Sequence, residues 1–130
     1  MSTLKVNTIQ DASGSNSSTP GEIANGRAKA WGNMSGAGTP GLRDSYNCSS
    51  ITDNDTGDYT INFTTDFVDN DYSFVATAEN WEGNNNDSYC GVSPYKGSFA
   101  VGSIRIKVLR WRWDGYNFKD TSFICFSVFR

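Results

Sequence analysis

The chain has 130 residues, of which 14 are acidic and 11 basic, with no histidine and three cysteines. This length fits one domain with one core. The lack of histidine argues against a zinc site and a Ser-His-Asp site, and Cys48, Cys90 and Cys125 are too widely spaced for a metal or redox motif. We therefore expect buried or incidental thiols, no metal and no cofactor.

The first residues carry no targeting signal. They lack the basic region and the apolar core of a signal peptide, and no stretch of the chain is apolar enough to span a membrane. These features indicate a protein made in a cytoplasm, with no membrane insertion.

The sequence predicts an arm at the N-terminus. Residues 4–9 have the pattern of a short strand. Residues 11–26 have the composition of a linker, because they are rich in Ser, Gly, Asn and Thr and cannot supply a core. Leu4, Val6 and Ile9 can pair as a strand with a partner. We predict an attachment arm and linker over residues 1–26 and a β-rich head domain over residues 27–130.

The sequence predicts, in the middle of the chain, several strands separated by turn-forming residues. We expect strands over residues 27–34, 42–52, 58–65 and 72–78, and loops over residues 35–41, 53–57 and 82–98. No window shows a convincing helical period. These patterns predict an all-β fold, an antiparallel β-sandwich or barrel of about six to eight strands.

Residues 99–130 hold most of the strong strand formers, and we expect them to form the central hairpin. Up to Val108 the apolar residues alternate with basic ones, but Leu109 and Trp111 fall on the opposite phase. A phase change of this kind requires a bulge or a change of packing face.

The Asp-Gly pair at residues 114–115 suits a two-residue hairpin turn. A turn at that position would set Trp113 opposite Tyr116 and Trp111 opposite Phe118.

The last predicted strand, residues 122–130, is apolar on both faces. One face carries Phe123, Cys125 and Phe129, and the other carries Ile124, Phe126 and Val128. A chain of this length has one core, so the second face suggests contact with another subunit.

Charge is unevenly spread along the chain. Residues 44–95 contain ten acids and no Lys or Arg, whereas residues 105–119 contain five basic residues and one acid. The net charge of −3 argues against a nucleic-acid partner, although charge and aromatic residues interleave at residues 110–113 as in some single-strand binders. The alternative is that the basic side chains cover apolar surface and lie opposite the acidic hairpin, which we expect over residues 42–65.

Several stretches resemble tail-fibre-like virion proteins of tailed bacteriophages, particularly those of cyanobacteria. They are SSITDNDTGDYTINFTTDF at 49–67, the opening STLKVNTIQDASG, GRAKAW at 26–31, DYSFVATA at 71–78, SIRIK at 103–107 and the closing SVFR. The resemblance implies a homotrimeric virion module attached by its N-terminal arm. We predict the trimer interface on one face of the last predicted strand, at Ile124, Phe126 and Val128. Only a short linker separates arm from head, which leaves a short fibre, an adaptor or a capsid decoration protein as alternatives.

Exposed aromatic rings stack on sugars, and this chemistry fits a module that contacts a host-surface glycan. The candidate ligand-binding residues are Trp81, Tyr89, Tyr95, Trp111 and Trp113. For each, packing in the core or at a subunit contact is the alternative.

We expect no enzyme activity. Glu79, Glu82 and Asp87 could supply the paired carboxylates of a glycosidase, but no apolar pocket motif surrounds them. The acids at 53–58 have oxygen-rich spacing, yet the glutamate that closes a calcium loop is missing, which favours a hairpin turn.

Overall fold

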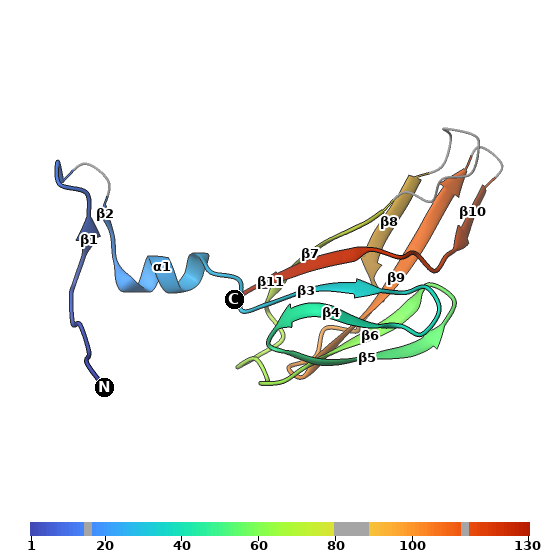
Figure 1. The fold of residues 1–130 in the computed structure, drawn as a ribbon, viewed down its shortest axis with the longest axis horizontal. Coiled ribbons are helices and arrows are strands. Elements are labelled where there is room, and N and C mark those ends of the chain that lie inside the picture. The colour runs from blue at the N-terminus through green and yellow to red at the C-terminus, as the bar shows by residue number, and fades with distance from the viewer. Residues whose placement is uncertain (15–16, 80–88, 113–114) are drawn as a thin grey trace.

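Figure 1 shows the computed structural model of the chain, which describes residues 1–14, 17–79, 89–112 and 115–130. The described elements are antiparallel strands and one short helix. In chain order they are β1 (Ile9–Gln10), β2 (Ser17–Ser18), α1 (Pro20–Gly26), β3 (Ala30–Ser35), β4 (Gly41–Tyr46), β5 (Cys48–Asp55), β6 (Asp58–Phe63), β7 (Ser73–Ala78), β8 (Tyr89–Pro94), β9 (Ser103–Arg112), β10 (Gly115–Phe118) and β11 (Ile124–Phe129). The predicted all-β fold with antiparallel sheets is confirmed.

We call residues 27–130 the head, and its described residues form two sheets. The larger sheet has the order β10-β9-β6-β5, with β8 on the other edge of β9, and the smaller has the order β4-β3-β11-β7. Strand β9 pairs along one edge with β6 and then β10, and along the other edge with β8. The strand predicted to be central therefore holds the larger sheet together.

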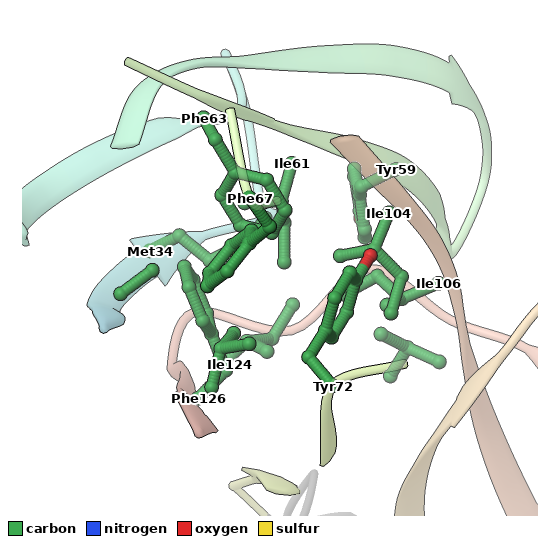
Figure 2. Packing of buried hydrophobic residues seen from close by; sticks show 13 residues of the cluster. Met34, Tyr59, Ile61, Phe63, Phe67, Tyr72, Ile104, Ile106, Ile124 and Phe126 are labelled. Carbon is green, nitrogen blue, oxygen red and sulfur yellow. The ribbon is translucent and has the colours of Figure 1, made fainter. Parts of the chain in front are cut away.

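One apolar cluster fills the space between the sheets (Figure 2). Alternate residues of a strand point to the same face, so each sheet turns its apolar residues inward. The buried residues are Ala30, Met34, Tyr59, Ile61, Phe63, Phe67, Tyr72, Ile104, Ile106, Val108, Ile124, Phe126 and Val128. The core thus draws on both the acidic hairpin and the C-terminal strands.

The predicted trimer interface is wrong, because the core already buries those residues. Ile124 and Val128 are fully buried within a single chain, and Phe126 is 4% exposed. The Phe126 ring fits there because small residues flank it: Gly32 on β3 and Ala76 on β7 are its Cα partners. A Cβ at Gly32 would lie 2.6 Å from the Phe126 ring.

The apolar phase change along β9 is a change of packing face, with no bulge. The pairings of β9 with its three neighbours run without a register shift. Val108 and the buried Arg110 continue the inward row, and Leu109 and Trp111 lie on the outer face.

The predicted β9–β10 register is also wrong. Trp111 lies opposite Tyr116, and Leu109 lies opposite Phe118, two residues from the expected pairing. Gly115 belongs to the strand and lies opposite Arg112. A slip of two residues keeps every side chain on its face, so alternation alone does not distinguish the two registers.

Two further boundaries differ from the prediction. The strand expected over 42–52 is broken at Asn47, whose backbone has a φ of 54°, so β4 and β5 belong to different sheets. The loop expected over 82–98 contains strand β8, which pairs with β9 along its length.

The N-terminal residues differ from the predicted strand and linker. Strand β1 is only two residues long, and a helix, α1, lies within the expected linker. Thr19 and Glu22 form a capping box, and Pro20 stands in the first turn, which together start this helix. Within the described residues no helix is long and apolar enough to cross a membrane.

Residues 1–26 lie to one side of the head in Figure 1, and their described residues are exposed or half-buried. We therefore expect deletion of residues 1–26 to leave the thermal unfolding midpoint of the head within about 2 °C of the full chain, because no core residue is removed. Differential scanning calorimetry of the two proteins measures this. A midpoint lowered by 10 °C or more would show that the arm stabilises the head.

Candidate functional site: an exposed aromatic face

The outer face of the larger sheet carries a group of exposed aromatic side chains. Residues paired across antiparallel strands lie on the same face, so the register places the rings in rows. Tyr116, Trp111 and Tyr89 form one row across β10, β9 and β8. Phe118 and Leu109 form the next row. We call these five residues together with Tyr95 the aromatic face.

The aromatic face is open to solvent. Tyr89 is 72% exposed, Tyr116 67% and Trp111 50%. The rings of Trp111 and Tyr116 lie 6.5 Å apart between centroids at an angle of 45°. Gly91, opposite Leu109 on β8, adds no side chain to this face, and a Cβ there would lie 3.4 Å from the Trp111 ring.

A cluster of charged side chains adjoins the aromatic face. Asp58 of β6 is opposite Lys107 of β9, and its side chain is only 2% exposed. Arg105 donates to both Asp58 oxygens, Nε to Oδ1 at 2.7 Å and Nη2 to Oδ2 at 2.6 Å, and Lys107 donates to Oδ2 as well. The hydrogen bond from Arg105 is the main cause that lowers the pKa of Asp58 to about 2.

Two rings flank these cations. The Tyr95 ring centroid lies 4.8 Å from the Arg105 guanidinium carbon and 5.4 Å from the Lys107 nitrogen. The Lys107 nitrogen lies 4.7 Å from the Phe118 ring centroid. The cations therefore join the aromatic face to the acidic hairpin, and the prediction that the basic side chains lie opposite that hairpin is confirmed for Arg105 and Lys107.

Polar side chains continue the same face on β5 and β6. The Asn62 amide nitrogen donates to Ser50 and Thr52 Oγ atoms at 3.0 Å, and the Asn54 amide nitrogen donates to Thr60 Oγ1 at 3.0 Å. One side of the sheet is thus aromatic, the centre is charged and the other side offers amides and hydroxyls.

The structure brings together three of the five predicted ligand-binding residues. Tyr89, Tyr95 and Trp111 share the aromatic face, although the sequence reasoning placed Tyr89 and Tyr95 in a loop. Trp81 and Trp113 lie outside the described residues. Tyr116 and Phe118 also belong to the site and were not predicted, although two aromatic residues at alternate positions just after a predicted hairpin turn were a usable signal.

The predicted attachment residues are accessible. Leu4 is 83% exposed, Ile9 53% and Val6 36%. None of them contributes to the core of the head.

The residues that were considered for a glycosidase or a calcium loop have structural roles where the structure describes them. Glu79 accepts a hydrogen bond from the Ser122 backbone amide at 2.7 Å, while Glu82 and Asp87 lie outside the described residues. The acidic segment at 53–58 is the predicted hairpin: β5 pairs with β6 around Thr56 and Gly57, and Gly57 adopts a φ of 62°.

The cysteines occupy different environments. Cys48 and Cys90 are half-buried, and burial raises the pKa of the Cys48 thiol to about 11, which keeps it protonated and unreactive. Cys125 is a free thiol exposed on the outer face of β11.

No family model, curated protein or solved structure matches this chain. The aromatic face and its charges therefore stand as the starting point for a function.

Proposed function

We propose that the chain is the receptor-binding module of a short virion fibre, in which the aromatic face binds a glycan on the host surface. The observation that carries this proposal is the gathering of Tyr89, Trp111 and Tyr116 in one exposed row across three strands. In this proposal the module is a virion structural protein without enzyme activity, and residues 1–26 attach it to another virion protein.

The chemistry of the face suits a sugar. Aromatic rings stack on the apolar C–H faces of pyranose rings, and rings held on strands need little ordering on binding. The neighbouring amides and hydroxyls, among them Asn62 and Thr60, can exchange hydrogen bonds with sugar hydroxyls.

Alanine substitutions of the row test the proposal. We expect Trp111→Ala and Tyr116→Ala each to weaken binding to a recognised polysaccharide by about tenfold or more, because each removes a stacking ring from an exposed position. Binding is measured with the purified chain on a panel of immobilised bacterial surface polysaccharides and as adsorption to whole cells.

Tyr46→Ala is the matched control. Tyr46 is 58% exposed on β4 of the other sheet, so its removal should leave both unfolding and glycan binding unchanged. Equal binding by all three variants and the unaltered protein would contradict a glycan site on the aromatic face.

A second candidate, a trimeric capsid decoration protein or fibre adaptor, is favoured by the outer face of the smaller sheet. Val75 is 58% exposed there and Trp31 38%, and both lie beside Ser127 of β11. If the chain forms the proposed homotrimer, this face is available to it, whereas the inward face of β11 is not. Sedimentation equilibrium of the chain at micromolar concentration measures the assembly, and a stable monomer contradicts the trimer.

A further inference from the structure

A cluster with an excess of positive charge adjoins the aromatic face. It consists of Asp58, Arg105 and Lys107, which the register places on the outer face of β6 and β9. One carboxylate faces two cations, so the cluster holds one positive charge in excess. Asp55 of β5 is opposite Asp58 and adds a second carboxylate to the outer face of the sheet, outside the cluster. The chain as a whole has a net charge of −3, so this excess is local.

Asp58 holds the cations in place and keeps its own oxygens occupied. The paired contact with Arg105, at 2.7 and 2.6 Å, uses Nε and Nη2, and Lys107 meets the same carboxylate. Asn54 also donates to Asp58 Oδ1 at 3.4 Å. A carboxylate so occupied neutralises one of the cations and orients both.

The cations keep donors that point away from Asp58. Nη1 of Arg105 has no partner within the part of the chain that the structure describes, and the Arg105 side chain is 40% exposed. The Lys107 side chain is 19% exposed. Its ammonium group has three N–H donors, of which one is directed at Asp58. The rings of Tyr95 and Phe118 lie against these groups, so donors and stacking surfaces adjoin.

We infer that the glycan bound by the aromatic face is acidic, with carboxylate or sulfate groups along the chain of sugars. This inference rests on the proposed function and names its ligand class. A sugar stacked on Phe118 or Tyr95 would place an anionic substituent within reach of the cations held by Asp58, because these rings lie 4.7 Å from the Lys107 nitrogen and 4.8 Å from the Arg105 guanidinium carbon. A partly desolvated cation beside aromatic rings binds an anion more strongly than a fully hydrated one does.

The same chemistry fits a nucleic acid less well. Single-strand binders track the backbone with a run of basic residues, whereas the cluster of Asp58, Arg105 and Lys107 has a single positive charge in excess.

Lys107→Gln is the decisive variant, because it removes the excess charge and leaves the Arg105–Asp58 contact intact. The probes are alginate oligosaccharides for carboxylate, dextran sulfate for sulfate, dextran as a neutral polymer and an oligothymidylate for nucleic acid. We expect the unaltered chain to bind at least one acidic polysaccharide about tenfold or more tightly than dextran, and Lys107→Gln to lose about tenfold of that affinity. Lys107→Arg should retain it.

Lys5→Gln is the matched control, because it makes the same charge change on the exposed arm. It should bind as the unaltered chain does. Equal affinity for dextran and the acidic polymers, or equal affinity of Lys107→Gln and Lys5→Gln, overturns the acidic ligand and leaves a neutral-glycan site standing. Binding to oligothymidylate in preference to every polysaccharide, or to no polysaccharide at all, overturns the proposed glycan function as well.

Discussion

Phe126→Asp is expected to unfold the head. Phe126 belongs to the core and is 4% exposed, and Ile124 lies near it in Figure 2. Val128, two residues further along β11, is also in the core. Loss of the ring costs about 3 to 5 kcal/mol, and the new carboxylate is buried without a partner, which adds several kcal/mol more. The sum approaches the whole stability of a typical domain of about 5 to 15 kcal/mol.

Circular dichroism and calorimetry of the variant measure this loss. We expect no cooperative unfolding transition near the transition temperature of the unaltered chain. Ser127→Asp is the control, since Ser127 is the next residue along β11 and points to the outer face. It should fold normally. A folded Phe126→Asp variant with altered assembly would instead place the core on the other face of β11.

Asp58→Ala is expected to destabilise the head by about 3 kcal/mol, because it leaves Arg105 and Lys107 facing each other without their shared carboxylate. Urea denaturation at pH 7 measures the free energy of unfolding. Asp69→Ala is the control: Asp69 pairs with Arg130 at the surface, where solvent screens the contact, and its loss should change stability little. An Asp58→Ala variant as stable as Asp69→Ala would show that the cluster does not stabilise the fold.

The Asp58 carboxylate also makes the free energy of unfolding depend on pH. Its pKa is about 2 in the folded chain against an ordinary value of 3.8. The ionised form is therefore favoured by folding, so its contribution is complete above about pH 4 and is lost as the pH falls toward 2. The shift corresponds to about 2 kcal/mol. Asp58→Ala should lose less stability across this pH range than the unaltered chain does.

The fold class follows from the sequence because alternation with period two is a local property. The inward row of β9, from Ile104 to Val108, and the two apolar faces of β11 are visible without a structure. Which face of β11 enters the core depends on its neighbours, since Gly32 and Ala76 open space for Phe126 only after β3 and β7 are known to flank it. That choice is a property of the packed sheets.

The site was predictable in part for the same reason. Trp111 stands out in the sequence as an aromatic residue on a regular strand, and Tyr89 and Tyr95 as aromatic residues beside a polar segment. Their common face depends on β8 pairing with β9, and glycine and proline in β8 conceal that strand in a search by composition. The contact of Asp58 with Lys107 joins residues far apart in the chain and likewise requires the register of the sheet.

If the outer face of the larger sheet is the binding surface, a bound oligosaccharide perturbs the strands of that sheet. Amide chemical-shift mapping of the isotope-labelled chain, titrated with an oligosaccharide that it binds, measures this. We expect the shifts to be concentrated in β8 and β10 and in the part of β9 from Arg105 to Trp111. Shifts concentrated around Trp31 and Val75 on the smaller sheet, with β8, β9 and β10 unperturbed, would place the binding surface elsewhere.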